Sequence, residues 1–253
     1  MLRTRRLVLE TAVTLAAGAM LVSPVRAAGR TPKFKAVAFD AFPVFDPRPV
    51  AVLTEKLYPG NGMALTNLWR TRQFEYTWLR TISGRYSDFM RVTEEALIFA
   101  TRTLKLDLPS DKRDDLLQAY LGLKAWPDAA PALQKLKAAG VRLAFLSNFT
   151  PAMLSGGIKA AGLTGMFEHA LSTDLAKTYK PDPRAYQLGI EALGLPREQI
   201  LFVAFAGWDA AGAKTFGYPT YWVNRLGLPP EELGVLADGT GANLTDLVPF
   251  VGA

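Results

Sequence analysis

The chain has 253 residues, of which 49% are hydrophobic and 21% are charged, with no cysteine and one histidine. These proportions are typical of a soluble globular protein whose length allows one large hydrophobic core, or a core and a smaller lobe. The lack of cysteine excludes disulfides, thiol nucleophiles and cysteine-ligated metal sites, and one histidine cannot form a histidine cluster around a metal. The net charge is +6, but four arginines and one glutamate in the first 27 residues account for +3 of it, which leaves +3. So small a charge, with no basic stripe, argues against nucleic-acid binding.

The first 27 residues have the three-part pattern of an export signal. Arginines precede the apolar stretch 11–22, and the small residue Ala27 suits a signal peptidase. The pair Arg5-Arg6 resembles a twin-arginine signal, which directs proteins across the membrane in the folded state. A membrane anchor is the alternative, but the apolar stretch is shorter than the ~20 residues that span a bilayer. We therefore expect residues 1–27 to be a cleaved twin-arginine signal peptide and the mature protein to be periplasmic, without membrane contact.

Short apolar runs that suit strands buried on both faces follow in the mature chain. They lie at residues 34–40, 141–147, 200–206 and, more weakly, 220–223. Helical patterns lie between them, at 128–140, which closes on a glycine, and at 183–194, which starts with a proline. Strands that alternate with helices predict an α/β fold with a Rossmann-like parallel sheet.

The segment from residue 47 to residue 125 breaks this alternation, because it contains only helical patterns. These lie at 63–79, 87–104 and 110–121, and Ser87 and Ser110 are the expected N-caps of the last two. We therefore predict an α/β core made of residues 28–46 and 126–253, with a helical cap subdomain, residues 47–125, inserted in it.

Polar residues come at or after the ends of the predicted strands, where open α/β sheets bind their ligands. Asp40 ends the first strand, Ser147 and Asn148 end the second, Asp209 follows the third, and Lys180 lies in a loop that leads into a helix. Each of these has an ordinary explanation, as a helix cap, a turn residue or a solvated surface charge. Their joint placement favours one site, with Asp40 as the candidate nucleophile, because a carboxylate can form a covalent ester.

Four segments resemble, in order, the motifs of the haloacid dehalogenase (HAD) superfamily. They are FDAFPVFD around Asp40, LSN at 146–148, YKPDPRAY at 179–186 and WDAAGA at 208–213. Residues 58–89, which include LWRTRQFEYTWLRT, are similar to the type II L-2-haloacid dehalogenases in particular. The resemblance implies a HAD-like fold and the conversion of short (S)-2-haloalkanoic acids to (R)-2-hydroxy acids, without a metal or other cofactor. The halocarboxylate and water would be the partners of the chain, and a homodimer through the cap helices is compatible with the resemblance.

The resemblance also implies which residues catalyse the reaction. Asp40 would displace the halide from C2 with inversion, and water would then hydrolyse the resulting ester. Lys180 would keep Asp40 ionised, and Asp209 would serve the hydrolysis. A carboxylate that attacks in a dry pocket requires a cation beside it, and a departing halide requires hydrogen-bond donors.

Residues of both predicted subdomains would bind the substrate. Arg70 and Asn148 would receive the halide, Ser147 would help to hold the substrate carboxylate, and Tyr186 would be hydrogen-bonded near the site. The expected apolar wall around the reacting carbon consists of Phe42, Phe74, Phe89 and Trp208. From the residues alone, ordinary packing explains each aromatic side chain, and Arg70 could be a solvated charge on an amphipathic helix.

A phosphatase is the rival within the superfamily, since most members transfer phosphoryl groups with Mg²⁺. The positions of the acid/base aspartate and of a metal-binding acid are occupied by Phe42 and Phe205, and a phenylalanine cannot bind a hard cation. The phosphatase is therefore the less favoured reading.

The chain departs from the dehalogenase pattern where the polar network behind the nucleophile is expected. Phe42-Pro43-Val44 replaces a Tyr-Gly-Thr, and Ala204 and Ala206 replace a serine and an asparagine. Losing one preorganised donor costs ~10²–10³ in rate. We therefore expect alkylation of Asp40 to survive better than hydrolysis of the ester. A degenerate, non-catalytic protein that binds small carboxylates in the same pocket is the alternative.

Overall fold

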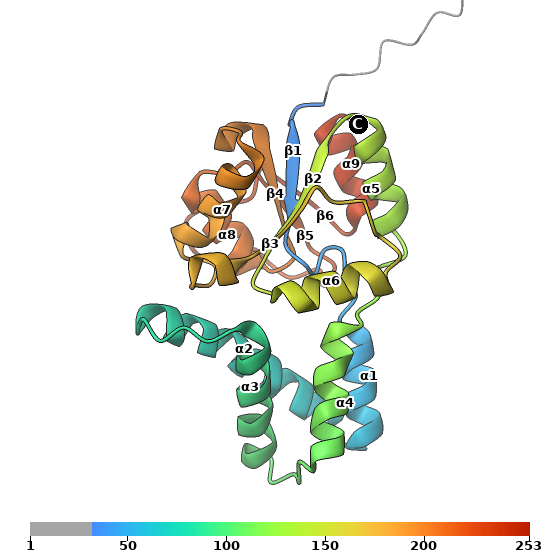
Figure 1. Ribbon diagram of the computed structural model, residues 1–253, viewed down its shortest axis with the longest axis vertical. Helices are drawn as coiled ribbons and strands as arrows, with labels where there is room; N and C mark the ends of the chain where they lie inside the picture. Colours follow the sequence, from blue (N-terminus) through green and yellow to red (C-terminus); the bar gives the residue numbers. More distant parts are fainter. Residues whose placement is uncertain (1–31) are drawn as a thin grey trace, which may run out of the picture.

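The computed structural model describes residues 32–253, so the predicted signal peptide, residues 1–27, lies outside the described residues. Figure 1 shows an α/β layer built on a parallel sheet and, beyond one end of that sheet, a separate group of helices. The strands of the described chain are Ala36–Phe39 (β1), Arg142–Ser147 (β2), His169–Ser172 (β3), Ile200–Ala204 (β4), Thr220–Val223 (β5) and Gly239–Gly241 (β6). They follow the order β3-β2-β1-β4-β5-β6, and every neighbouring pair is parallel. The predicted α/β fold with a Rossmann-like parallel sheet is confirmed.

The central strands β1 and β4 are apolar along their whole length because helices cover both faces of the sheet. The covering helices are α5 (Ala129–Ala138), α7 (Pro183–Leu193), α8 (Gly207–Phe216) and α9 (Leu244–Val251). Successive side chains of a strand point to opposite faces. In β1, Val37 and Phe39 pack on the side of α5 and α9, whereas Ala36 and Ala38 pack on the side of α7 and α8 (Figure 1). Both sets are fully buried, so burial on two sides explains the continuous apolar runs.

Two strands were not predicted, because their sequences carry little strand signal. The strand β3 has the sequence HALS and lies beside β2, with Leu146 opposite Leu171. The strand β6 is the tripeptide GTG at the sheet edge, where Trp222 is opposite Thr240. Both are formed by pairing with an adjacent strand, which a local pattern does not reveal.

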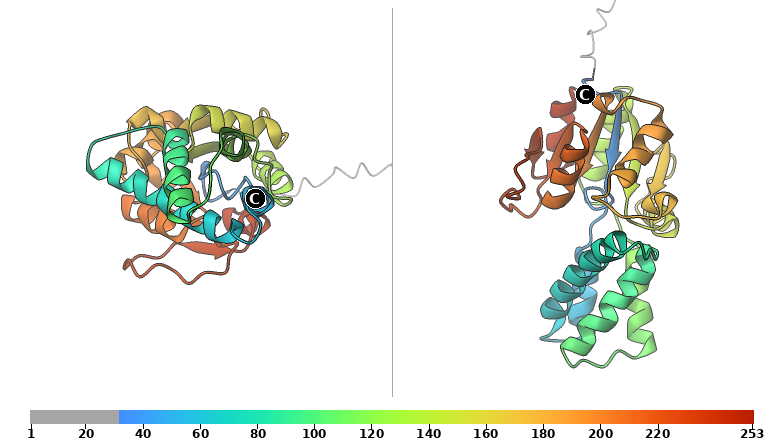
Figure 2. Two further views of the ribbon diagram at one scale, coloured as in Figure 1. Left: turned by 90° about the horizontal axis from the view of Figure 1, so that it is seen from below. Right: turned by 90° about the vertical axis from the view of Figure 1, so that its left-hand side faces the viewer.

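The chain between β1 and α5 forms a bundle of helices. These are α1 (Arg48–Leu57), α2 (Gly62–Ile82), α3 (Phe89–Thr103) and α4 (Ser110–Leu121). A buried hydrogen bond joins the two longest helices of the bundle: the Trp69 Nε1 of α2 donates to the Thr93 carbonyl of α3 at 2.8 Å. The helix α1 was not predicted; it starts with a proline in its first turn and buries only Val50 and Thr54. Figure 2 shows from a second direction that the bundle lies beyond the carboxyl ends of the strands.

The predicted N-caps of α3 and α4 were wrong by one residue. Asp88, not Ser87, has extended backbone angles and accepts a hydrogen bond from the Arg91 N–H at 2.9 Å. Ser110 is the first residue of α4, and Pro109 precedes it as the cap. An aspartate next to a serine offers a stronger acceptor for the free N–H groups of the first turn, which accounts for the shift in α3.

The chain passes between the sheet and the helix bundle twice, along residues 42–47 and 122–126. The two passages run antiparallel, with a β-bridge between Phe45 and Ala125. Helix α6 (Pro151–Ala160), which follows β2, packs against α4 of the bundle. Within residues 32–253, no helix has the length and apolar character that a membrane span requires.

Candidate active site

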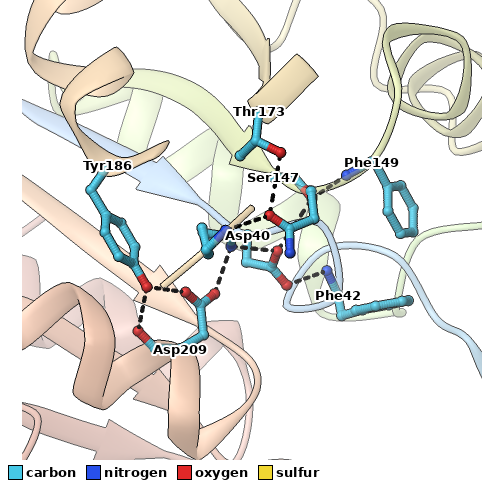
Figure 3. A network of polar contacts seen from close by, with 9 residues as sticks. Asp40, Phe42, Ser147, Phe149, Thr173, Tyr186 and Asp209 are labelled. Atoms are coloured by element: carbon cyan, nitrogen blue, oxygen red, sulfur yellow. Dashed lines mark hydrogen bonds and ion pairs between the residues drawn. The ribbon is translucent and has the colours of Figure 1, made fainter. Parts of the chain in front are cut away.

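The predicted polar residues meet at the carboxyl ends of the central strands. Asp40 directly follows β1, Ser147 is the last residue of β2, and Asp209 lies in the first turn of α8, which follows β4. The strand order reverses at β1, which lies between β2 and β4, so the site occupies the switch point of the sheet. Lys180 comes from the loop before α7 and reaches the same point. Figure 3 shows Ser147 and Asp209 beside Asp40.

The two carboxylate oxygens of Asp40 have different environments. Oδ1 accepts hydrogen bonds from the Lys180 Nζ at 2.8 Å and from the Ser147 Oγ at 3.2 Å. Within the described residues, Oδ2 accepts only the backbone N–H of Phe42, at 3.2 Å. Oδ1 is therefore held by a cation and a hydroxyl, and Oδ2 is the oxygen with more freedom to react.

Lys180 bridges two carboxylates from a fully buried position. Its side chain is 1% exposed, and besides Asp40 its Nζ donates to the Asp209 Oδ2 at 2.6 Å. Burial by itself lowers the pKa of a lysine, but the charges of Asp209 and Asp40 outweigh it and raise the pKa of Lys180 above its ordinary value. The side chain therefore supplies a permanent positive charge beneath Asp40.

Asp209 is a weaker acid than an ordinary aspartate. Burial raises its pKa to about 6; Lys180 opposes the rise and the charge of Asp40 adds to it. The Tyr186 Oη donates to the Asp209 Oδ1 at 2.7 Å. Burial, followed by the charge of Asp209, raises the pKa of Tyr186 well above 10, so the phenol keeps its proton. Asp209 can thus change its protonation state near neutral pH while remaining fixed in place.

Asn148 presents its amide donor to the cavity. Its Oδ1 accepts the Lys180 backbone N–H at 3.0 Å and the Thr173 Oγ1 at 3.3 Å. Because an N–H can donate only to the oxygen, these contacts fix the orientation of the amide and direct Nδ2 away from them. Asn148 is 4% exposed and lines the cavity, so Nδ2 is a donor available to a bound anion.

Aromatic side chains from the sheet layer and the bundle enclose the cavity over Asp40. Phe42 meets Phe149 edge to face, with ring centroids 5.1 Å apart, and Phe74 meets Trp208 in the same way at 5.4 Å. The residues that line the cavity are Asp40, Phe42, Arg70, Phe74, Phe89, Ser147, Asn148, Phe149, Phe205, Ala206, Trp208 and Asp209. The cavity has a volume of about 10 Å³, which is room for a single water molecule. It leaves little room for water beside the carboxylate of Asp40, whose side chain is 13% exposed.

Arg70 reaches this cavity from α2. Its guanidinium lies 5.6 Å from the centroid of the Phe205 ring. No ion pair joins Arg70 to another residue in 32–253, so its charge is available to an anion in the cavity.

All the predicted site residues lie at this cavity, in two layers. Lys180 and Tyr186 lie beneath it and contact its carboxylates, and the others line it. Sequence reasoning missed Phe149 and Thr173. Phe149 directly follows the Ser-Asn pair and could have been found from that position, whereas Thr173 follows the strand β3, which was itself not predicted.

The three positions that lack the expected polar group differ in their surroundings. Val44 is fully buried among hydrophobic side chains, and Ala204 packs on the α7 and α8 face of the sheet. Ala206 lines the cavity and is the N-cap residue of α8, where its methyl group cannot accept the N–H groups of the first turn. Among residues 32–253, no three carboxylate, histidine or cysteine side chains are grouped so as to hold a metal ion.

Comparison with known proteins agrees with this geometry. The haloacid dehalogenase-like hydrolase family matches residues 7–217. The (S)-2-haloacid dehalogenase of Pseudomonas sp. (strain YL) is 43% identical over 215 residues, which are 85% of this chain and 93% of that protein. The haloacetate dehalogenase H-2 of Moraxella sp. (strain B) is 43% identical over 82% of this chain and 93% of its own length.

Solved structures of haloacid dehalogenases have the same fold as this chain. A crystal structure of an L-2-haloacid dehalogenase, 43% identical, superimposes with a TM-score of 0.86 over 87% of this chain and 100% of its own. The L-2-haloacid dehalogenase from Xanthobacter autotrophicus with chloropropionic acid covalently bound is 38% identical, with a TM-score of 0.80 over 86% and 98% of the two chains. The chain therefore belongs to the haloacid dehalogenase-like hydrolases and, among them, to the (S)-2-haloacid dehalogenases.

Proposed function

We propose that the chain hydrolyses short (S)-2-haloalkanoic acids to (R)-2-hydroxy acids through an ester on Asp40. The observation that carries this proposal is the unequal environment of the Asp40 oxygens. Lys180 and Ser147 hold Oδ1, while Oδ2 has a single backbone donor among residues 32–253, at a small cavity lined by aromatic rings. A carboxylate with a buried ammonium beside one oxygen and few donors on the other is a suitable nucleophile for carbon.

In the first half-reaction, Oδ2 of Asp40 attacks C2 of the substrate. A carbon–oxygen bond forms as the carbon–halogen bond breaks, the halide leaves with the electron pair, and C2 is inverted. The Arg70 guanidinium and the Asn148 Nδ2 are the donors that receive the halide. The aromatic wall removes water that would otherwise solvate the nucleophile and the halide.

In the second half-reaction, water attacks Cγ of Asp40 and gives a proton to Asp209. Negative charge develops on Oδ1, to which Lys180 and Ser147 already donate, so the oxyanion needs no rearrangement of its donors. The bond from Cγ to Oδ2 then breaks, and the hydroxy acid leaves with Oδ2 as its hydroxyl oxygen and with the proton from Asp209. The other proton of the water is released to the solvent.

Halide release tests the proposal directly. Purified protein is incubated with chloro-, bromo- and fluoroacetate and with (S)-2-chloropropionate, and free halide is measured for the wild type and for Asp40→Asn. The wild type should release halide and the variant should not, because an amide oxygen is a poor nucleophile. In ¹⁸O water under single-turnover conditions, the product should be unlabelled and Asp40 should gain the label. Binding of the halocarboxylates without halide release would instead identify a non-catalytic carboxylate-binding protein.

We propose further that hydrolysis of the ester is the slower half-reaction. Val44, Ala204 and Ala206 provide no hydrogen-bond donors or acceptors from their side chains, and two of them lie close in sequence to Asp209, which must hold the water. Mixing with 2-chloropropionate should then give a burst of halide that matches the enzyme concentration, followed by slower turnover. The mass of the intact protein and of its Asp40 peptide should show the ester during this slow phase. Steady turnover without a trapped ester would contradict the proposal.

The sequence also supports proposals about the export of the protein, its division into a core and a cap subdomain, and its oligomeric state. Residues 1–27 would direct the chain to the periplasm by the twin-arginine route, residues 47–125 would form the cap subdomain, and the mature chain could pair as a homodimer through the cap helices. Cell fractionation of strains with and without Arg5-Arg6→Lys-Lys tests the first, and sedimentation of the purified protein tests the last.

A further inference from the structure

We propose that Trp126 and Arg225, which lie outside the cavity, are positioning residues for the nucleophile. This inference rests on the proposed function of Asp40. The segment that follows Asp40, residues 41–44, carries the backbone N–H that donates to its reactive oxygen, that of Phe42 to Oδ2 at 3.2 Å. Any motion of this segment therefore changes the orientation of the attacking atom.

Two residues from other parts of the chain bind three successive carbonyls of this segment. The Trp126 Nε1 donates to the Phe42 carbonyl at 2.9 Å, and the Trp126 backbone N–H donates to the Val44 carbonyl at 3.0 Å. The Arg225 Nη2 donates to the Pro43 carbonyl between them, at 2.8 Å. Phe42, Pro43 and Val44 have no polar side chains of their own. These contacts therefore order the segment together with the hydrogen bonds that the Val44 and Phe45 N–H groups donate to the Ala41 carbonyl.

Arg225 is itself fixed to the α/β core. Its guanidinium forms hydrogen bonds to both carboxylate oxygens of Asp128, at 3.0 and 2.8 Å, and its side chain is 7% exposed. Burial would raise the pKa of Asp128, but Arg225 and the Leu244 N–H at the start of α9 outweigh it and lower the pKa below its ordinary value. Asp128 therefore stays charged, and the pair ties the segment to two core helices.

The Trp126 indole lies between two guanidinium groups. Arg225 is 4.3 Å from the ring centroid and Arg48 is 4.4 Å from it. The two differ in their polar contacts: Arg225 reaches the Pro43 carbonyl, whereas the side-chain hydrogen bonds of Arg48 go to Asp46. Arg48 thus provides a matched control, because it touches the same ring without binding the segment next to the nucleophile.

The test compares Trp126→Phe and Arg225→Gln with the control Arg48→Gln. Trp126→Phe keeps an aromatic ring between the arginines and removes the Nε1 donor. The rate of ester formation on Asp40 is measured by intact mass at saturating 2-chloropropionate. We expect it to fall roughly tenfold in the first two variants, because small displacements of reacting groups are costly. KM should change less than twofold, and Arg48→Gln should alkylate like the wild type. A role in stability alone would lower the Tm without changing the rate constant of the folded enzyme.

Hydrogen exchange at the Phe42 amide provides a second readout that needs no substrate. Exchange should be at least tenfold faster in Trp126→Phe than in the wild type or in Arg48→Gln. If Trp126→Phe does not fold, incorporation of benzothienylalanine at position 126 removes the N–H and keeps the bicyclic shape. Alkylation and Phe42 exchange at wild-type rates would overturn the inference, as would equal losses in Arg48→Gln. If the wild type forms no ester, the proposed function fails, and the exchange measurement alone then decides whether Trp126 orders the segment.

Discussion

The charge balance of the site depends on Lys180, so Lys180→Met is the most informative single substitution. Methionine keeps most of the side-chain volume but leaves the carboxylates of Asp40 and Asp209 facing each other without a cation. Removing one partner of a buried ion pair costs about 3–5 kcal/mol, because the remaining charge stays buried without compensation. We expect the free energy of unfolding near pH 7.5 to fall by about this amount, and the ester on Asp40 no longer to form.

The loss of unfolding free energy in Lys180→Met should be smaller near pH 5 than near pH 7.5, and the pKa of Asp209 explains the direction of this difference. Its pKa in the folded protein, about 6, lies above the ordinary 3.8, so folding favours its protonated form. The stability that comes from this proton is complete below pH 3.8 and is lost as the pH rises through about 6. Lys180 lowers the pKa of Asp209, so the removal of Lys180 must raise this pKa further. Near pH 5 Asp209 is mostly neutral with or without the lysine, so only Asp40 loses its partner.

Urea unfolding of both proteins at the two pH values measures this difference. Lys214→Met is the control, since its Nζ lies at the same 2.6 Å from a carboxylate, that of Asp238, but the pair is about one-third exposed. An exposed pair of this kind contributes about 0–1 kcal/mol. Losses of less than about 1 kcal/mol in Lys180→Met at both pH values, or losses that do not depend on pH, would refute the argument that Lys180 neutralises two buried carboxylates.

Three further predictions concern the half-reactions. The rate of ester hydrolysis should rise with pH through the pKa of Asp209, because only ionised Asp209 accepts a proton from water. This pKa is about 6 in the free enzyme and should be lower in the ester, where Asp40 no longer carries the charge that helps to raise it, and Tyr186→Phe should move it upward. A rate that is flat from about pH 4 to pH 8 would contradict this assignment. Arg70→Lys should slow the initial burst of halide at least tenfold at saturating substrate, because an ammonium lacks the planar set of donors and the contact with Phe205. An unchanged burst rate would mean that Arg70 does not meet the halide. Ala206→Asn should stabilise the protein by about 1 kcal/mol through a new N-cap on α8, as measured by urea unfolding. It should also shorten the lifetime of the ester, as measured by intact mass. An ester lifetime unchanged in a stabilised variant would show that water is held elsewhere.

The sheet was largely predictable because burial on both faces leaves a continuous apolar signal. The runs around β1, β2 and β4 have this signal, and the structure buries each of them between two layers of helices. The sequences of β3 and β6 have no such signal, since their strand conformation follows from pairing with β2 and β5. The cap of α3 was misplaced for a related reason, as two adjacent residues could serve and only the backbone geometry selects Asp88.

The residues of the site also differ in how far the sequence alone could predict them. The rule that ligands bind at the carboxyl ends of strands was enough to single out Asp40, Ser147 and Asp209. Lys180 in a loop looks like a solvated charge, and its burial depends on contacts with carboxylates that are 140 and 29 residues distant in the sequence. The place of Arg70 depends on how α2 packs over the sheet, so its role came from the resemblance to a family rather than from any local pattern.

The two half-reactions make different demands on the same residues, and the structure meets them unequally. Alkylation needs an ionised carboxylate with one free oxygen, donors for the halide and a dry wall. Lys180, Arg70, Asn148 and the aromatic side chains are placed for these tasks. Hydrolysis needs, in addition, a water molecule fixed at Cγ of Asp40, and Asp209 is the group in the cavity whose pKa suits it to take the proton. Its partners are Lys180 and Tyr186, which orient Asp209 but lie beneath the cavity and cannot hold the water above it. The missing side-chain donor at position 206 therefore affects the water more than the nucleophile.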